Sequence, residues 1–510
     1  MNNSKENVGV TNERAAKLIV DQLVQQGVRF FSLSPGSRST AFAIAIAEHP
    51  EACSVVHFDE RGSGFQALGY AKGANAPAAV LVTSGTAVGN LLPAVMEASV
   101  AQIPLILITT DRPQELRGIG SNQTVDQVKI FRDYVRWQLD LPCSDPLIPD
   151  AYLGTSVAHA VFQSMHAPKG PVQLNCMFRE PLFSQTPLAT PHLLSTHYEK
   201  SFPLPASTTL EGWASLLASR EKGVIIVGGN AGIDDEAPIY ELAKKLGFPI
   251  IADILSGIRT SHSHVIPYSD LILKTVQDLK VDTVLHFGDR LVSKTLLEWL
   301  AASSPSLYFL VAAHPVFHDP KHQVTHRLEC SPSLFSQLLY PHLEIAQHRF
   351  FQEWKNRAES IEICLEQLFA DQATLTEPGL ANYLAKNLPT AWSLFLANSM
   401  PVRDADTFFF PKHEKSHQIF ANRGVSGIDG NIATVVGIAH AIKRPIVAVL
   451  GDQTFLHDLN SLALLKKCPY PVLLLVVNNA GGAIFSFLPI ASKKELMDDY
   501  FAATHDLTFQ

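Results

Sequence analysis

The stretch IVAVLGDQTFLHDLNSLALLKKCPYPVLLLVVNNAGGAIFSFLP, residues 446–489, decides the fold of this chain. An apolar run over Ile446–Leu450 ends at Gly451-Asp452, and a second run over Val472–Val477 ends at Asn478-Asn479. Four leucines recur at helical spacing between the runs: Leu456, Leu459, Leu462 and Leu465. We therefore expect one helix between two parallel strands, whose ends meet at one edge of a sheet.

Oxygen-bearing side chains gather at this edge. Asp452 supplies a carboxylate, Asn479 supplies an amide oxygen, and the Gly-Gly turn supplies backbone carbonyls. This ligand set is suited to Mg²⁺ carrying a diphosphate. An ordinary crossover unit with an aspartate at a strand end remains an alternative here, because Gly-Asp and Asn-Asn pairs are common in turns.

Length and composition describe a large globular protein. With 510 residues, 46% of them hydrophobic and 17% charged, the chain is long enough for two to four domains. The net charge of −8 gives no basic field for nucleic acid. The six cysteines lack CxxC spacing, and the 20 histidines are dispersed without an HExxH motif. We therefore expect neither a zinc site nor a disulfide framework. A reducing compartment is expected instead.

Two further features indicate a cytoplasmic protein. The first residues, MNNSKENVGVTNERAAK, contain no apolar core of the signal-peptide type. No uncharged apolar run approaches the length needed to span a membrane. We expect no integral membrane association.

Strand–helix units follow one another in the N-terminal part. A helix capped by Thr11 or Asn12 is expected first, with Gly27 at its end. Expected strands lie at 28–33, 54–58, 78–83 and 105–109, and the expected helices include 40–47 and 87–99. Each strand ends in a polar cluster: SPGSRS (34–39), DER (59–61), SGT (84–86) and TDRP (110–113). This pattern predicts a parallel sheet covered on both faces, with all four clusters at one edge.

Two of these clusters carry distinctive chemistry. The turn around Arg38 can hold a carboxylate or phosphate through backbone N–H groups and the guanidinium. Glu60, at a strand end facing a cofactor, would be partly desolvated, which raises its pKa and allows it to share a proton with a ring nitrogen. The plainer interpretation of Glu60 is a solvated acid at a helix start.

The remaining chain predicts further α/β structure. A linker is expected over 181–209, strands at 224–227, 249–253, 283–287, 306–311 and 393–397, a surface helix over 348–369, and a surface loop over 404–418. The Gly-Gly-Asn-Ala-Gly turn at 228–232 is not a full GxGxxG motif, so it is only a weak nucleotide signal.

Segments at both ends of the chain resemble a known family. Gly451-Asp452 through Asn478-Asn479 resembles the thiamine diphosphate fingerprint, with Gln453 where Gly is usual. SPGSRST (34–40), HFDERGSGFQALGYAKG (57–73), TSGTAVGNLLPAVMEAS (83–99), TTDRPQEL (109–116) and NQTVDQV (122–128) look like the pyrimidine-binding domain of the 2-succinyl-5-enolpyruvyl-6-hydroxy-3-cyclohexene-1-carboxylate synthase family. ANRGVSGIDG (421–430) and NNAGGAIFSFLP (478–489) resemble its diphosphate-binding domain.

The resemblance implies an α/β fold with three doubly wound parallel-sheet domains. These are a pyrimidine-binding domain over residues 1–186, a middle domain over 205–345 and a diphosphate-binding domain over 373–510. The family ordinarily continues past the position of Gln510 through further helices and a strand, so we expect the third domain to be shortened at its C-terminal side.

The resemblance also implies a reaction. A family member is a transferase of menaquinone biosynthesis that uses thiamine diphosphate with Mg²⁺ or Mn²⁺. It decarboxylates 2-oxoglutarate and adds the product in conjugate fashion to isochorismate. Because Glu60 and Asp452 lie in different domains that must meet across one cofactor, a homodimer or a dimer of dimers is expected.

Roles for individual residues follow from the resemblance. The metal ligands would be Asp452, Asn479 and the carbonyl of Gly481. The catalytic residues would be Glu60, on the pyrimidine ring nitrogen, and Ile428, the apolar wedge that keeps the two rings of the cofactor folded together. Other cofactor contacts would come from Ser84, Gly85, Thr86, Asn90, Gln453, Thr454, Ala483 and Ile484. Substrate contacts would come from Ser37, Arg38, Arg112, Gln123, Lys294, Ser399, Arg403, Arg423, Ile484 and Phe485. Thr295 stands where many relatives have Arg, so part of the expected charge beside Lys294 is absent.

Two alternatives stay open on the sequence. The first is another thiamine diphosphate-dependent carboligase or 2-oxoacid decarboxylase, which would not need so many arginines for monocarboxylate substrates. The second is a catalytically inactive scaffold of the same fold.

Overall fold

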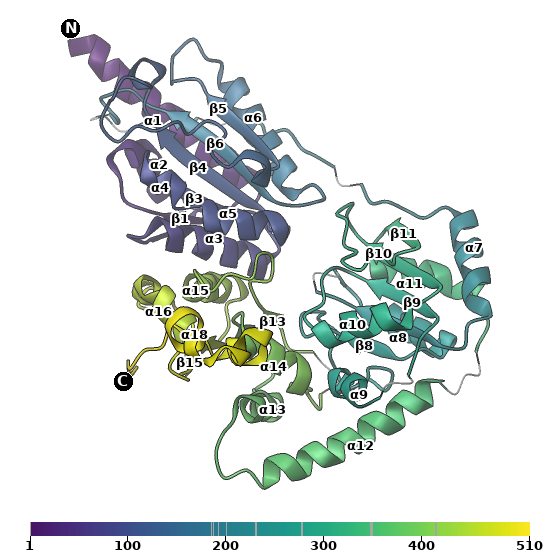
Figure 1. The fold of residues 1–510 in the computed structure, drawn as a ribbon. Helices are drawn as coiled ribbons and strands as arrows, with labels where there is room; N and C mark the ends of the chain where they lie inside the picture. Colours follow the sequence, from purple (N-terminus) through teal and green to yellow (C-terminus); the bar gives the residue numbers. More distant parts are fainter. Residues whose placement is uncertain are drawn as a thin grey trace.

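Three parallel sheets organise the chain in the computed structural model (Figure 1). The structure describes residues 2–509 except 185, 187, 192, 200, 230, 231, 277, 278, 347–349, 414 and 415, and except the side chains of residues 2–7. We call the parts around the three sheets the N-terminal module (residues 2–177), the middle module (207–370) and the C-terminal module (377–509). Among the described residues the strands pair in parallel and helices flank each sheet, which confirms the predicted fold class.

The N-terminal module has six strands in the order β2-β1-β3-β4-β6-β5. Their bounds are β1 Phe30–Leu33, β2 Cys53–Val56, β3 Ala78–Val82, β4 Leu105–Asp111, β5 Trp137–Leu141 and β6 Pro171–Met177. The helices are α1 Asn2–Gln25, α2 Thr40–Glu48, α3 Glu60–Ala74, α4 Thr86–Gly89, α5 Leu92–Val100 and α6 Asp150–Met165. Four strands were predicted, while β5 and β6 were not. The helix predicted over 87–99 is divided into α4 and α5.

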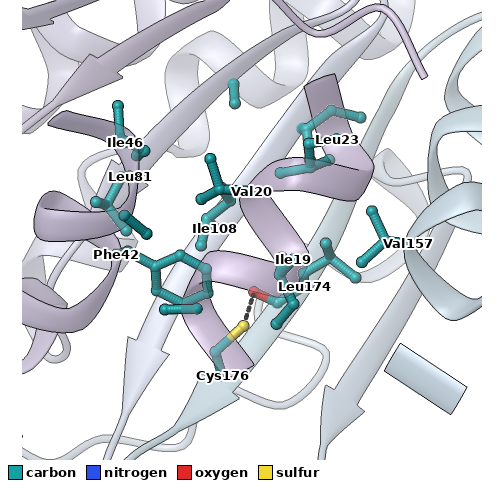
Figure 2. Packing of buried hydrophobic residues seen from close by; sticks show 14 of the residues in the cluster. Ile19, Val20, Leu23, Phe42, Ile46, Leu81, Ile108, Val157, Leu174 and Cys176 are labelled. Carbon is teal, nitrogen blue, oxygen red and sulfur yellow. Dashed lines mark hydrogen bonds between the residues drawn. The ribbon is translucent and has the colours of Figure 1, made fainter. Parts of the chain in front are cut away.

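Helix α1 covers one face of this sheet. Ile19, Val20 and Leu23 are almost completely buried and pack beside the strand residues Ile108 and Leu174 (Figure 2). The predicted cap at Thr11 or Asn12 was wrong, because both residues lie inside the helix. The Asn12 side chain instead donates to the carbonyls of Arg179 at 2.8 Å and Pro181 at 2.9 Å, which ties the chain after β6 to α1.

The segment between β6 and the middle module contains no helix or strand in its described residues, as predicted for a linker. Part of it runs along α1, where Lys17 Nζ donates to the Leu188 carbonyl at 2.5 Å and Gln22 to the Leu193 carbonyl at 3.1 Å. The first helix of the middle module, α7, begins at Ser207, slightly earlier than the predicted end of the linker.

The middle module has five strands in the order β11-β10-β9-β7-β8. Their bounds are β7 Gly223–Val227, β8 Ile250–Ala252, β9 Thr283–Phe287, β10 Leu307–Ala312 and β11 His326–Glu329. The helices are α7 Ser207–Ala218, α8 Ala237–Leu246, α9 Ser269–Thr275, α10 Lys294–Ser303, α11 Pro332–Leu339 and α12 Phe350–Ala370. Within the predicted turn at 228–232, residues 230 and 231 lie outside the described part.

Helix α12 forms the long connection to the C-terminal module (Figure 1). It was predicted as a surface helix over 348–369, of which 348 and 349 lie outside the described residues. One side of α12 is buried, because Phe350, Trp354 and Ala358 pack into the core of the middle module. The helix is therefore docked on that module along its first half.

The C-terminal module has four strands in the order β13-β12-β14-β15. Their bounds are β12 Ser393–Leu396, β13 Ile419–Phe420, β14 Ile446–Gly451 and β15 Val472–Val477. The helices are α13 Glu377–Asn387, α14 Met400–Phe408, α15 Asn431–Ile442, α16 Asp452–His457, α17 Leu462–Leu465 and α18 Lys494–Leu496. The strand–helix–strand unit predicted at 446–489 is present.

Two predictions in this module were wrong. The single helix expected after Gly451 breaks between α16 and α17, because the Asp458 carboxylate turns to accept the Ile432 and Ala433 N–H groups at the start of α15, at 2.8 and 3.1 Å. Leu459 is consequently 43% exposed and not on a buried face. The surface loop expected over 404–418 begins inside α14, and Asp406 is buried against Arg259 at 2.7 Å; residues 414 and 415 lie outside the described part.

Helices α3 and α15 join the N-terminal and C-terminal modules (Figure 1). Their backbones approach closely at Gly69 and Gly437. A Cβ at Gly69 would overlap the carbonyl of Thr434, and a Cβ at Gly437 would overlap the carbonyl of Gln66. Glycine at these two positions is what allows the two helices to pack at this distance.

Across the ranges described above, no helix combines the length and the apolar character needed to cross a membrane.

Candidate active site

A cavity of about 310 Å³ lies at the carboxyl edge of the third sheet. Gly451 pairs with Val477, so the ends of β14 and β15 are neighbours, as the sequence predicted. The cavity is lined by Glu377, Asn398, Ser399, Met400, Pro401, Arg403, Arg423, Ser426, Ile428, Gly451, Asp452, Gln453, Thr454, Val477, Asn479, Gly481, Gly482, Ala483, Ile484 and Phe485. It therefore brings together every residue predicted for the diphosphate, the metal and the substrate in the C-terminal module.

Asp452 is the buried acid of this cavity. Its side chain is 3% exposed, and its oxygens accept from the N–H groups of Gln453 at 2.6 Å and Gly481 at 2.9 Å. His505 Nε2 lies 3.3 Å from Asp452 Oδ2. The bond from Gly481 fixes the turn after β15 against the end of β14, so the two strand ends act as one unit.

The donor set of the cavity fits Mg²⁺. Asn479 donates through its amide nitrogen to Glu377 Oε1 at 3.2 Å, and this bond does not involve its amide oxygen. With the Asp452 carboxylate and the Gly481 carbonyl, the set is entirely oxygen and carries one charge. Mg²⁺ is usually bound by one or two carboxylates plus phosphate oxygens and water. No cluster of three or more His, Cys, Asp or Glu suited to a metal occurs among the described residues.

Two arginines make the other side of the cavity cationic. Arg423 donates to Asn398 Oδ1 at 2.8 Å, and Arg403 donates to the Ser399 carbonyl. Burial lowers the pKa of Arg423, and the positive charge of Arg403 lowers it further. Two neighbouring guanidinium groups of this kind favour an anion between them. Ser399 itself has φ +73°, a strained conformation that is typical of functional sites.

The apolar residues Ile428, Ala483, Ile484 and Phe485 form the rest of the cavity wall. Gly481 adopts φ +148°, and its Cβ position would lie 2.6 Å from the Ala502 carbonyl, so the turn needs glycine there. The apolar residues can therefore exclude water from one side of a bound group, while the turn at Gly481 lies close to the same group.

A second cluster lies at the carboxyl edge of the first sheet. Asn90 Nδ2 donates to Glu60 Oε2 at 3.2 Å, and Gln123 Nε2 donates to the Ser84 carbonyl at 3.0 Å. Arg112 donates to the Ser84 hydroxyl. The remaining predicted cofactor residues, Gly85 and Thr86, belong to the same turn, at the start of α4. Five of the predicted cofactor residues thus form one connected group.

Arg38 and Arg112 form the cationic part of this second cluster. Burial lowers the pKa of Arg112, and Arg38 lowers it further. Arg38 is paired with Glu180 at 3.1 Å and donates to the Phe178 carbonyl at 2.9 Å. Ser37 is exposed beside it. The N-terminal and C-terminal modules therefore each contribute one pair of arginines.

The two clusters remain separate within the chain. Glu60 does not line the cavity at Asp452 in the described structure. Its neighbours contact the far end of α16 and the turn after it: Arg61 donates to the His457 carbonyl at 2.9 Å, and Asp59 accepts from Asn460 at 3.1 Å. Lys294 belongs to neither cluster, because its side chain is 85% exposed and paired with Glu298 on its own helix.

Sequence reasoning missed Glu377 and did not assign a role to Asn398. Glu377 lies at the start of α13 and lines the cavity. The sequence around it contains no motif, so nothing in the sequence indicated a role in the site. Asn398 directly precedes Ser399, and its amide donates to the carbonyls of Asn422 at 2.6 Å and Gly427 at 2.7 Å. It fixes the segment that carries Arg423 and Ile428.

Comparisons with known proteins agree with this geometry. Residues 13–130 match the family described as "Thiamine pyrophosphate enzyme, N-terminal TPP binding domain", and residues 196–396 match "Middle domain of thiamine pyrophosphate". A 2-succinyl-5-enolpyruvyl-6-hydroxy-3-cyclohexene-1-carboxylate synthase of Rubrobacter xylanophilus is 40% identical over 98% of this chain and 89% of its own length. The synthase of Salinibacter ruber is 40% identical over 97% of this chain and 86% of its own. Protein PHYLLO, chloroplastic, of Arabidopsis thaliana is 35% identical over 97% of this chain and 32% of its own.

The three parallel sheets and the oxygen-lined cavity, together with these matches, define a thiamine diphosphate-dependent enzyme. More narrowly, the chain belongs to the 2-succinyl-5-enolpyruvyl-6-hydroxy-3-cyclohexene-1-carboxylate synthase family. The resemblance seen in the sequence is confirmed. It is a transferase of menaquinone biosynthesis.

Proposed function

We propose that this chain decarboxylates 2-oxoglutarate and adds the remaining succinyl unit to isochorismate, giving 2-succinyl-5-enolpyruvyl-6-hydroxy-3-cyclohexene-1-carboxylate, with thiamine diphosphate and Mg²⁺ or Mn²⁺ as cofactors. One observation carries the proposal. A single cavity is lined by Asp452, Asn479, Ile428 and two arginines, Arg403 and Arg423. Both proposed substrates are dicarboxylates, and paired arginines suit them better than they would suit a monocarboxylate.

The metal and the diphosphate would be held at the edge of the third sheet. Asp452, Asn479 and the Gly481 carbonyl would bind the cation, while Gln453 and Thr454, at the start of α16, would contact the phosphate groups. Thr454 is buried, and Gln453 is partly buried. A helix start favours a phosphate because its N–H groups are not used inside the helix. Ile428, Ala483 and Ile484 would contact the ring part of the cofactor.

Thiamine diphosphate supplies an electron sink for the loss of CO₂ from a 2-oxo acid. Glu60 would hold a proton at the pyrimidine ring nitrogen, a role supported by its hydrogen bond with Asn90 in the cluster with Ser84, Gly85 and Thr86. Such a carboxyl group acts as a positioned acid–base group. The protein would thus set protonation and geometry.

The substrate carboxylates would be received by charged and polar groups from both clusters. Arg403, Arg423 and Ser399 would act from the C-terminal module, and Ser37, Arg38, Arg112 and Gln123 from the N-terminal module. Phe485 and Ile484 would exclude water beside the reacting carbon. Lys294 stays in the proposal through the family resemblance alone, since its side chain points into neither cluster in this chain.

We further propose that the pyrimidine-binding domain spans residues 1–186, the middle domain 205–345 and the diphosphate-binding domain 373–510. A complete site would combine Glu60 of one subunit with Asp452 of another, in a homodimer or a dimer of dimers. This is supported by the separation of the two clusters within one chain. We propose a cytoplasmic location, and the six cysteines, which are all free, agree with a reducing compartment.

The reaction is tested by measuring CO₂ release from 2-oxoglutarate with Mg²⁺ and thiamine diphosphate, with and without isochorismate. The proposal predicts that isochorismate increases the release and that the product contains the succinyl unit. Pyruvate, a monocarboxylate, serves as the control substrate and is expected to react poorly. Release that ignores isochorismate would instead indicate a simple decarboxylase, and no release would indicate an inactive scaffold.

A further inference from the structure

The segment that carries Arg423 is held from outside its own module. The backbone N–H of Gly424 donates to Glu97 Oε1 at 2.9 Å, and the N–H of Val425 donates to Glu97 Oε2 at 2.8 Å. Glu97 lies on α5 of the N-terminal module. On the carbonyl side, Arg290 of the middle module donates to the Arg423 carbonyl at 3.4 Å and to that of Gly424. Three modules therefore meet at this short segment.

The Glu97 carboxylate is placed to make these bonds strong. Its side chain is 1% exposed, so the carboxylate relies on protein partners in place of water. Each oxygen takes one backbone N–H group, and Lys72 Nζ lies 3.9 Å away. Hydrogen bonds to a charged acceptor are about twice as strong as neutral ones. Lys72 also donates to the Ala421 carbonyl at 2.6 Å, so Glu97 and Lys72 together contact the segment at two points.

The fit between α5 and the segment is close. A Cβ added at Gly424 would lie 2.8 Å from both the backbone oxygen and Oε2 of Glu97. Any side chain at this position would push the segment away from α5. Glu97 therefore limits how the backbone at Gly424 can pack against α5.

The held backbone is continuous with a side chain that lines the cavity. Arg423 precedes Gly424 directly, and its guanidinium reaches Asn398 Oδ1 at 2.8 Å on the cavity wall. Glu97 itself does not line the cavity in the described structure. A shift of the 424–425 backbone would move the arginine without changing any residue that contacts a substrate.

We propose that Glu97 is a positioning residue, which holds the backbone of Gly424 and Val425 so that Arg423 meets a substrate carboxylate. The inference rests on the proposed function, in which Arg423 binds a dicarboxylate. It adds a role for a residue of the N-terminal module in presenting a substrate-binding arginine of the C-terminal module of the same chain.

The kinetic test compares Glu97→Gln with the wild-type enzyme. Glutamine keeps one acceptor oxygen and replaces the other with an NH₂ group that faces an N–H donor. We expect KM for the dicarboxylate substrates to rise about tenfold, as for the loss of one charge-assisted hydrogen bond, while kcat changes much less. Glu51→Gln, which breaks an exposed ion pair with Arg29 in the same module, is the matched control and should leave KM unchanged.

A double-mutant cycle separates positioning from general damage. If Glu97 acts through Arg423, Glu97→Gln should raise KM no further in an Arg423→Ala background. Equal effects in both backgrounds would overturn the proposal. Gly424→Ala changes the same contact from the other side and should reproduce the KM effect. It therefore keeps the test decisive if Glu97→Gln fails to fold.

Hydrogen exchange tests the contact without any assay of activity. Amides in a peptide covering residues 421–430 should exchange about tenfold faster in Glu97→Gln than in the wild type. Unchanged exchange would overturn the proposal even if KM rises. If the wild-type chain released no CO₂ while exchange in the variant increased, the proposed function would fail and the contact itself would stand.

Discussion

Glu60 is the residue on which the proposed chemistry depends most. Changing Glu60→Gln keeps the size of the side chain and its bond with Asn90 but removes the acid that would hold the ring proton. We expect CO₂ release to fall by at least about a hundredfold, the usual contribution of a positioned acid–base group. Binding of Mg²⁺ and thiamine diphosphate, followed by tryptophan fluorescence, should stay close to wild type. Loss of cofactor binding would show that Glu60 has another role.

Asp404 gives the protein a pH-dependent element of stability. Burial, and then the negative charge of Glu377, raises the pKa of this carboxyl group from 3.8 to about 7. Between about pH 4 and pH 7 the folded protein therefore binds more protons than the unfolded chain, and the free energy of unfolding falls as the pH rises. Asp404→Asn removes this titration.

We expect the advantage of Asp404→Asn over wild type, in free energy of unfolding, to grow as the pH rises from about 4 to about 7. Urea unfolding at several pH values measures it. Asp371→Asn, an exposed aspartate after α12, is the control and should give a constant difference near zero. A constant difference for Asp404→Asn as well would contradict the raised pKa.

At the residue scale, the sequence predicted side chains that belong to motifs and missed those whose partners lie far away in the sequence. Asp452, Asn479 and Ile428 follow strand ends or lie in recognisable segments, and the structure brings them to one cavity. Glu97 and Glu377 are ordinary helix residues by pattern. Glu377 lies more than a hundred residues from its partner Asn479, and Glu97 lies 327 residues from its partner Gly424. Local sequence patterns therefore give no signal of these contacts.

At the scale of elements, α3 and α15 form a close helix contact between the N-terminal and C-terminal modules. Gly437→Ala places a methyl group against the Gln66 carbonyl on α3, so the helices must separate. We expect a loss of about 1–3 kcal/mol in the free energy of unfolding, typical of overpacking. Chemical denaturation measures this.

Gly212→Ala in α7 is the matched control for this helix contact. A Cβ at Gly212 meets nothing within 4 Å, so the substitution should leave stability unchanged or raise it by up to about 1 kcal/mol. Equal effects of the two substitutions would contradict the close packing of α3 on α15.

Strand positions were easier to predict than helix ends. Continuous apolar runs identify parallel strands such as β14 and β15. Most of β14 is buried, whereas β15 is only partly buried. The break between α16 and α17 was missed because Asp458 makes its bonds with the start of α15, a tertiary contact that outweighs local helical spacing. The cap predicted at Thr11 or Asn12 was wrong for a similar reason, since the Asn12 side chain bonds to the chain after β6 and not to a helix end.

At the scale of the whole molecule, the sequence indicated three α/β parts, and three parallel sheets are present. It did not indicate how they meet. That arrangement depends on groups such as Glu97, Arg290 and Gly437, which contact other modules and whose spacing within their own segments is unremarkable. Because the Glu60 cluster is separate from the Asp452 cavity, the proposed function requires a second chain to complete the site.

A mixture of two inactive variants tests most directly whether the cofactor lies between subunits. Glu60→Gln and Asp452→Asn each damage one cluster, and co-expression produces mixed dimers in which one of the two sites has both wild-type residues. If the cofactor lies between subunits, the mixture should recover about a quarter of wild-type CO₂ release, since about half of the dimers are mixed. If the mixture is shown to contain mixed dimers but recovers no CO₂ release, this would contradict the claim that Glu60 and Asp452 of different chains share one cofactor.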